Sequence, residues 1–150
     1  MSAPAIDLVD QIWPGLMGAD AAGAYLVGGR CASCGAVSLG LRDVCARCWS
    51  SGGMEAVPIG RTGRLYSATM VHQVPEGFDA PFLAGYVDLP EGLRAFAHIG
   101  LGAARPAIGA DVVLQVAPIR KGKDGRMLSG PLYVAAGAVS AGPQPDGDAP

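Results

Sequence analysis

Apolar and polar positions divide the chain into segments of different periodicity. Between residues 54 and 139, short runs rich in Val, Ile, Tyr and Phe are separated by Gly and Pro, a pattern typical of consecutive β-strands. The pattern predicts strands at 54–59, 63–73, 82–88, 93–98, 112–118 and 132–136. Five or six short strands, one long enough to bend between two sheets, favour an OB-type Greek-key barrel over residues 54–139.

Two polar segments predict exposed connections between these strands. Residues 89–92 read Leu-Pro-Glu-Gly, and Pro and Gly supply the fixed and the positive φ angles that tight turns require. Residues 121–126 read Lys-Gly-Lys-Asp-Gly-Arg, a charged and glycine-containing sequence. Both segments are therefore expected to be hairpin loops at the barrel surface.

The segments outside the barrel have other patterns. Residues 1–26 carry a loosely helical apolar pattern interrupted by Pro14 and Gly15, which predicts one or two short helices. Residues 27–53 contain all the cysteines and end in a loose Ser-Ser-Gly-Gly linker. Residues 140–150 carry no large apolar side chain and predict a disordered tail. The expected protein is mainly β, with short helices, a cysteine module, a barrel and a tail.

Composition indicates a protein that is not a free monomer. The chain has 150 residues, enough for one core, and no apolar run reaches the roughly 18 residues of a membrane span. Apolar residues make up 50% and charged residues only 16%, against about 25% charged in typical soluble domains. We therefore expect a soluble protein whose apolar surface is covered by a permanent partner in a hetero-oligomer.

Charge disfavours a nucleic-acid partner. OB barrels and zinc ribbons both recur in nucleic-acid-binding proteins, so a nucleic-acid-binding OB-fold module is an alternative function. Such modules combine a positive groove with aromatic platforms. This chain has a net charge of −2, a pI near 5.5 and only 6% aromatic residues.

Four cysteines carry the strongest chemical signal. Cys31, Cys34, Cys45 and Cys48 form two CxxC pairs separated by ten residues. Two tight knuckles supply the four soft ligands of a tetrahedral Zn²⁺ site. Because four protein ligands leave no open coordination position for substrate, we predict a structural zinc ribbon. Four thiolates also bind iron, which leaves the metal open.

Disulfides and redox chemistry are the competing interpretations. Four cysteines allow three disulfide pairings, but the N-terminal residues lack the pattern of a secretory signal, so we expect a cytoplasmic protein with reduced thiols. A thioredoxin-like role needs a CxxC in a βαβ context, which the pattern does not predict.

Residues beside the cysteines are expected to support a zinc site. Gly35 is expected to adopt a positive φ angle after the first knuckle. Three basic residues are expected to offset the −2 charge of a zinc–tetrathiolate centre: Arg30, Arg42 and Arg47.

The chain offers little for catalysis. Its two histidines, His72 and His98, each lie in a predicted strand without a local motif that would orient a base. If metal takes all four cysteines, no thiol is left as a nucleophile. We therefore expect no catalytic residues in this chain.

The motifs resemble one known family. The paired knuckles in CASCGAVSLGLRDVCARC, the strand start at Gly63, Tyr66 and Ser67, and the strand FLAGYVDL before Glu91 and Gly92 resemble the OB-fold proteins with a rubredoxin-like zinc ribbon. That family, formerly a domain of unknown function, supplies small partner subunits to thiolase-like acyl-CoA enzymes. The resemblance covers about residues 25–120.

The resemblance implies a noncatalytic accessory subunit of a thiolase-type acyl-CoA-processing complex. Such a subunit stabilises the catalytic chain and helps to form the coenzyme A site. Partners in the family also include thiolase-like aldolases and acyl-CoA hydratases, so these complexes are the alternatives. Coenzyme A phosphates call for basic side chains. The candidate contacts, to these phosphates or to the partner, are Arg120, Lys121, Lys123 and Arg126.

Overall fold

The computed structural model describes residues 10–101 and 105–138. Over these residues it contains nine strands and one 3₁₀ turn: β1 (Met17–Asp20), β2 (Gly23–Cys31), β3 (Val37–Leu39), β4 (Met54–Ile59), β5 (Thr62–Val71), β6 (Phe82–Asp88), β7 (Arg94–Ile99), β8 (Asp111–Lys121), β9 (Met127–Ala135) and η1 (Ala136–Ala138). The predicted mainly β class is confirmed. In the part described, no helix combines the length and apolar character needed to cross a bilayer. The tail predicted at 140–150 lies outside the described residues.

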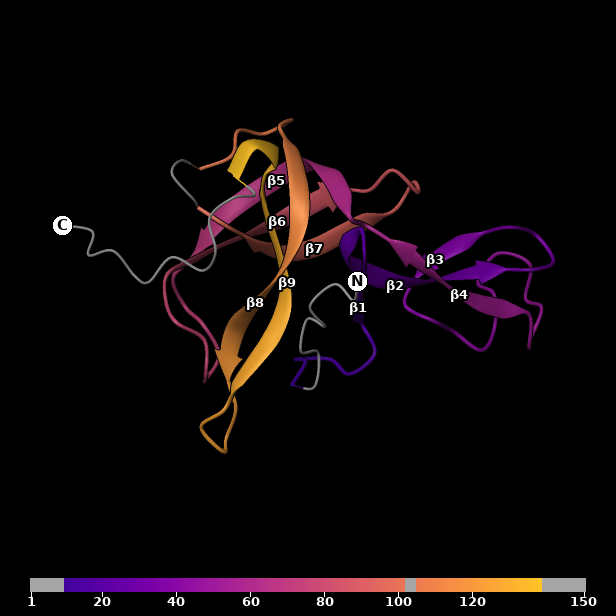
Figure 1. The fold of residues 1–150 in the computed structure, drawn as a ribbon, viewed down its shortest axis with the longest axis horizontal. Helices are drawn as coiled ribbons and strands as arrows, with labels where there is room; N and C mark the ends of the chain where they lie inside the picture. Colours follow the sequence, from indigo (N-terminus) through magenta and orange to yellow (C-terminus); the bar gives the residue numbers. More distant parts are fainter. Residues whose placement is uncertain (1–9, 102–104, 139–150) are drawn as a thin grey trace.

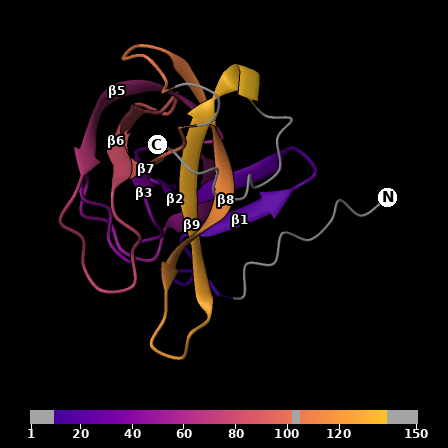
Figure 2. The ribbon, with the colours of Figure 1, turned by 90° about the vertical axis from the view of Figure 1, so that its left-hand side faces the viewer.

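Strands β5 to β9 close into a barrel in the order β5-β6-β7-β9-β8 (Figures 1 and 2). Neighbouring strands are antiparallel except β7 and β9, which pair in parallel at His98↔Leu132 and Ile99↔Tyr133. Because β9 lies between β7 and β8, the last two strands complete a Greek key after a simple β5-β6-β7 meander. The predicted OB-type barrel of five or six strands is confirmed, and it has five.

The hairpin of β8 and β9 is longer than the pattern predicts. Its ladder runs from Val112↔Ala135 to Lys121↔Met127, so the polar residues Arg120 and Lys121 belong to a strand. Backbone pairing does not depend on side-chain polarity, which allows the hairpin to continue beyond its apolar residues. The connection itself is therefore shorter than the predicted 121–126 loop, and the hairpin extends beyond the rest of the barrel (Figure 1).

A second sheet carries the cysteines. Its central strand, β2, pairs with β1 and β3 along one edge and with β4 along the other. The sequence pattern assigned β4 to the barrel, which was wrong, because its residues pair with β2 from Leu26↔Ile59 to Cys31↔Met54. We call residues 27–53 the cysteine ribbon. In Figure 1 its strands and loops extend away from the barrel.

The predicted N-terminal helices are not present in residues 10–26, and residues 1–9 lie outside the described part. Ile12 donates its N–H to the carbonyl of Ser129, and Ser129 donates its N–H to the carbonyl of Asp10, at 2.8 and 2.7 Å. The Gln11 side-chain amide exchanges two hydrogen bonds with the backbone of Met17, at 3.2 and 3.1 Å. Long-range partners thus satisfy the backbone groups that a helix would use locally.

One hydrophobic core joins the two sheets. Met17, Leu26 and Ile59 from the second sheet pack in the same cluster as Leu65, Leu83, Val87, Val112, Leu114 and Tyr133 from the barrel. Ile59 and Tyr133 are 1% and 0% exposed. The strands β2 and β4 are therefore anchored in the barrel core through Leu26 and Ile59, which fixes the direction in which the cysteine ribbon leaves the barrel.

Candidate functional site

The two CxxC segments fold into equivalent knuckles. In the first, CASCGA, Cys31 donates its N–H to the carbonyl of Ala36 at 2.9 Å, and Gly35 donates to the carbonyl of Cys31 at 2.8 Å. In the second, CARCWS, the corresponding bonds run from Cys45 to Ser50 and from Trp49 to Cys45, both 2.9 Å. The same hydrogen bonds thus turn both pairs of thiols toward the space between the knuckles.

The residue after each second cysteine has a positive φ angle. Gly35 has φ of 72°, as predicted for the first knuckle, and Trp49 has φ of 64° at the equivalent place in the second. Glycine adopts this conformation freely, whereas a residue with a Cβ rarely does. Trp49 is therefore an unusual residue at a position that the knuckle geometry reserves for a left-handed backbone.

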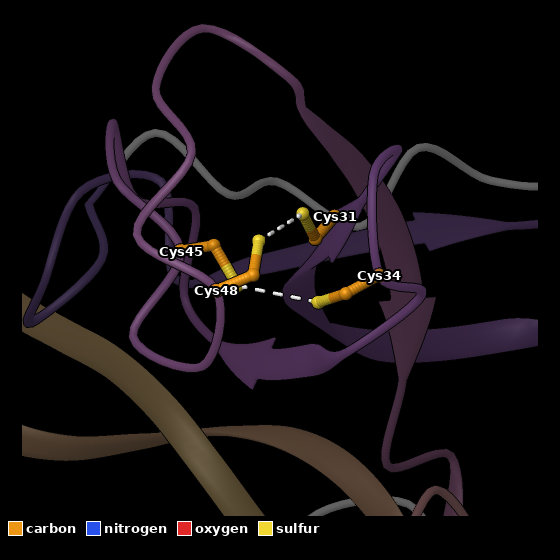
Figure 3. Close-up of side chains that lie close together, drawn as sticks. All are labelled: Cys31, Cys34, Cys45 and Cys48. Carbon is orange, nitrogen blue, oxygen red and sulfur yellow. Dashed lines mark hydrogen bonds between the residues drawn. The ribbon is translucent and has the colours of Figure 1, made fainter.

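The four sulfur atoms converge on one point (Figure 3). All four Sγ atoms lie within 4.8 Å of one another, with Cys31 Sγ 3.6 Å from Cys48 Sγ and Cys34 Sγ 3.7 Å from Cys45 Sγ. An ion about 2.3 Å from each of four sulfurs in a regular tetrahedron would hold them about 3.8 Å apart. The cluster therefore fits a tetrahedral metal ion of the size of Zn²⁺.

The same distances exclude disulfides between these pairs in the structure. A disulfide brings its sulfurs to about 2.0 Å, far closer than the 3.6 and 3.7 Å found here. All four cysteines are free thiols, and Cys31 and Cys45 are only 1% and 2% exposed. Cys34 is half-buried and Cys48 is exposed, so the cluster has one buried side and one side open to solvent.

The pKa values of the thiols show why the cluster favours a cation. Hydrogen bonding from Ser50 lowers the pKa of Cys31 to about 6, and the same hydroxyl lowers the pKa of Cys48. A backbone hydrogen bond near Ala36 favours the thiolate of Cys34, yet desolvation and the neighbouring cysteines raise the pKa of that thiol to about 11. Cys31 and Cys48 are therefore the thiols most ready to ionise, whereas a thiolate at Cys34 beside them requires a compensating positive charge.

Ser50 belongs to the sulfur cluster, although the CxxC motif did not indicate it. Its Oγ lies 3.3 Å from Cys31 Sγ and 3.1 Å from Cys48 Sγ, so it contacts one sulfur from each knuckle. Aligning CASCGA with CARCWS would have marked Ser50 as the counterpart of Ala36. Arg30, Arg42 and Arg47 are exposed, and among residues 10–101 and 105–138 none of them forms a salt bridge.

The predicted basic cluster lies on the β8–β9 hairpin, but its members differ. Arg126 contacts Asp124 at 2.8 Å and Asp10 at 3.5 Å, which neutralises its charge locally. Arg120 is half-buried with its guanidinium 5.6 Å from the centre of the Phe78 ring. Lys121 and Lys123 are exposed. The hairpin carries all four residues, which differ in exposure and in charge pairing.

Among the residues that the structure describes, neither histidine has a hydrogen-bonding partner that would orient it as a base. His72 is exposed after β5. His98 stacks on Phe82 with ring centres 4.2 Å apart, and burial lowers its pKa. A neutral, stacked imidazole is a packing element of the barrel wall.

An aromatic face on β5, β6 and β7 was not predicted. Tyr86 and Phe96 contact each other edge to face at 5.3 Å, and both are exposed. Arg94 lies 3.4 Å from the centre of the Tyr66 ring and forms two hydrogen bonds with Asp88, at 2.6 and 3.2 Å. The alternation of buried and exposed positions in β6 and β7 could have predicted that Tyr86 and Phe96 lie on the outer face. Their contact with each other could not be predicted, because it depends on the register between the two strands.

Comparisons with known proteins agree with this architecture. The family model described as "ChsH2, C-terminal OB-fold domain" matches residues 56–117. The chain is 36% identical over 100 residues to the benzoylsuccinyl-CoA thiolase subunit BbsA of Geobacter metallireducens, covering 67% of each chain. It is 36% identical over 107 residues to BbsA of Thauera aromatica, covering 71% of this chain and 74% of that one.

More distant relatives extend the comparison. A DUF35 domain-containing scaffold protein of Methanocaldococcus jannaschii is 32% identical over 76 residues, covering 49% of this chain and 54% of the relative. The solved structure of an Ltp2-ChsH2(DUF35) aldolase superposes with a TM-score of 0.59 at 28% identity, over 75% of this chain and 85% of that one. The chain therefore belongs to the family of OB-fold proteins that includes ChsH2 and the thiolase subunit BbsA, as the motifs of its sequence indicated.

Proposed function

We propose that this chain is a noncatalytic accessory subunit of a thiolase-like acyl-CoA-processing complex, in which a separate chain carries the chemistry. The observation that carries this proposal is the 36% identity to two thiolase subunits named BbsA, over two thirds or more of their length. A surface with few charges supports it, because such a surface favours a permanent protein partner.

The four-cysteine centre supports a structural role within that subunit. We assign Cys31, Cys34, Cys45 and Cys48 as ligands of one Zn²⁺ ion, on the basis of their donor set and sulfur spacing. Bound zinc would supply no chemistry toward substrate, because four thiolates fill its coordination sphere. It would join the two knuckles and stiffen the far end of the cysteine ribbon. Reduced thiols of this kind suit a cytoplasmic protein.

The β8–β9 hairpin is the proposed contact to coenzyme A. Lys121 and Lys123 are exposed, and Arg120 lies beside them on β8, so these side chains offer positive charge to phosphate groups. Arg126 belongs to the predicted set, but two carboxylates already hold it. We therefore place the proposed contact mainly on the two lysines.

The test is reconstitution with the catalytic chain. The protein would be co-expressed with the thiolase-like chain encoded nearest to it in its native host, and the mixture analysed by size-exclusion chromatography with light scattering. We expect a stable hetero-oligomer with thiolytic activity toward a β-keto acyl-CoA, while this chain alone is inactive. Two separate peaks for the purified chains would contradict the proposal.

An aldolase complex is the second candidate, because the solved relative is titled an Ltp2-ChsH2(DUF35) aldolase. The same reconstitution, run with a β-keto acyl-CoA and separately with a β-hydroxy acyl-CoA, distinguishes the two candidates by substrate and product. Thiolysis consumes free coenzyme A and gives two thioesters, whereas retro-aldol cleavage gives a carbonyl compound and one thioester. An acyl-CoA hydratase partner would give neither product pair, because hydration adds water without cleaving the chain.

A further inference from the structure

Trp49 stands out among the exposed aromatic residues. Its side chain is 79% exposed, and its backbone has φ of 64°, a conformation that the equivalent Gly35 adopts without cost. Tyr66, Tyr86 and Phe96 are also exposed, but each contacts another ring or Arg94. Within the described residues, no such contact involves Trp49. A large apolar side chain thus occupies a position where glycine would fit better and touches no aromatic partner.

The loop around Trp49 carries two further exposed apolar side chains and is held in shape by backbone hydrogen bonds. Leu41 and Val44 are 56% and 44% exposed in the same segment. Val44 pairs with Ser51 across the loop, and Cys45 bonds to Ser50 immediately inside that pair. A side chain on a loop already fixed by its backbone loses little entropy when a partner binds it. Trp49 is therefore presented in advance of binding.

The charges beside Trp49 indicate what would surround it in a complex. Arg42, Asp43 and Arg47 are exposed in this loop, and among the described residues none of them forms a salt bridge, so the two guanidinium groups outnumber the one carboxylate. An apolar anchor with free guanidinium groups at its border is complementary to an apolar pocket rimmed by carboxylates. Trp and Arg are also the residue types most enriched among the energetically dominant residues of protein interfaces.

We propose that Trp49 is the anchor by which this subunit docks into an apolar, carboxylate-rimmed pocket on the catalytic chain of its complex. This inference rests on the proposed function and adds to it the surface and the chemistry of the contact. A buried Trp side chain covers about 150–250 Å², against about 800 Å² per partner in a standard interface. Trp49 would therefore be the centre of a larger contact that includes the exposed Leu41 and Val44 of the same loop.

The test compares Trp49→Gly and Trp49→Ala in the full chain, with the dissociation constant for the purified catalytic chain measured by calorimetry. Both variants remove the indole, but glycine suits the positive φ angle whereas alanine does not, so Trp49→Gly should retain the melting temperature and metal content of the native chain. We expect both variants to bind at least about 30-fold more weakly, the loss typical of a dominant interface residue. Trp13→Gly is the matched control, because Trp13 is 61% exposed outside the cysteine ribbon, and it should bind as the native chain does.

The possible outcomes distinguish a failure of the Trp49 anchor from a failure of the proposed function. If the native chain binds the catalytic chain and Trp49→Gly binds equally well, the anchor is wrong and the proposed function stands. If the native chain does not bind at all, the proposed function fails, and the anchor fails with it.

Reversing the charges beside Trp49 with Arg42→Glu and Arg47→Glu tests the proposed carboxylates of the partner pocket. The double variant should associate with the catalytic chain more slowly at low salt. Faster association would show that the pocket is not rimmed by carboxylates.

Discussion

The Tyr133 hydroxyl donates a hydrogen bond to the carbonyl of Gly60 at 2.7 Å. Gly60 lies in the two-residue connection between β4 and β5, where the chain passes from the cysteine-bearing sheet into the barrel. Its N–H donates to the carboxylate of Glu91 at 3.2 Å. Both backbone groups of this buried junction are therefore held by side chains of the barrel, one from β9 and one from the β6–β7 turn.

Replacing Tyr133 with Phe tests the strength of that junction. The variant keeps the buried ring but removes the donor to the Gly60 carbonyl. Leaving a buried carbonyl without this partner costs about 1–3 kcal/mol. We expect the free energy of unfolding in urea to fall by that amount, with an unchanged dependence on denaturant concentration. A loss below about 0.5 kcal/mol would mean that the hydroxyl contributes little to the junction.

Tyr133 also predicts a loss of stability in alkali. Burial and the charge of Glu91 raise the pKa of Tyr133, whereas an unfolded tyrosine titrates near pH 10. Above about pH 10 the unfolded chain releases this proton and the folded chain keeps it, so stability falls as pH rises. The native chain should therefore lose stability more steeply than Tyr133→Phe between pH 9.5 and 11 (on the order of 1 kcal/mol per pH unit). Parallel pH profiles of the two proteins would contradict this assignment.

Gly85 is the position where the barrel tolerates a side chain least. A Cβ built there would lie 1.9 Å from the carbonyl oxygen of Ser67 on the adjacent strand, next to the irregularity between Leu65 and Ser67. Backbone cannot move aside as a flexible side chain can, so we expect Gly85→Ala to cost more than about 3 kcal/mol, or to prevent folding.

Gly53→Ala is the control for that variant, because its nearest contact would be an ordinary 3.7 Å to Ala32. Circular dichroism melting curves should show native-like unfolding for Gly53→Ala and a lowered or absent transition for Gly85→Ala. Equal melting temperatures for the two variants would show that β5 and β6 separate more easily than the close approach indicates.

The four-cysteine centre predicts one metal ion per chain. Elemental analysis of purified protein should give a stoichiometry near one for zinc, and Cys45→Ser should abolish it, because three thiolates bind far more weakly than four. Ser33→Ala changes a residue between two ligands without removing a donor and is the matched control. A native chain without bound metal, or one carrying iron, would contradict the zinc assignment.

The basic hairpin predicts a difference among its members. In the reconstituted complex, Lys121→Ala with Lys123→Ala should weaken acyl-CoA binding, more strongly at low salt, because exposed charges act through a screened field. Arg126→Ala is the control, since Asp10 and Asp124 already occupy its guanidinium. Calorimetric titration with coenzyme A should separate the two variants. Equal affinities for the double variant and the native complex would place the coenzyme A contact elsewhere.

The parts of the fold that sequence could predict are those with local signals. The strands of the barrel follow from alternation and turn residues, and β6 was placed at its observed bounds of Phe82–Asp88. Clustering of the cysteines follows from the two CxxC pairs, because the knuckle hydrogen bonds connect residues at most five positions apart.

The features that sequence could not predict depend on distant partners. β1 is four residues long and contains Gly18 and Ala19, so it has no strand signature of its own and forms by pairing with β2. β4 looks like a barrel strand, and only its pairing with β2 places it in the other sheet. Ser50 and the Arg94–Tyr66 stack likewise depend on contacts that the sequence pattern does not contain.

Because β2 and β4 carry the core residues Leu26 and Ile59 at one end and Cys31 at the other, the two halves of this protein cannot be exchanged as independent cassettes. A shortened version that begins at β5 would uncover the side of the barrel where Met17, Leu26 and Ile59 pack, and would need that side redesigned with polar residues. Conversely, a protein engineer who wants a new recognition loop can vary residues 40–44, keep all four cysteines and the ladder between β2 and β4, and leave the barrel intact.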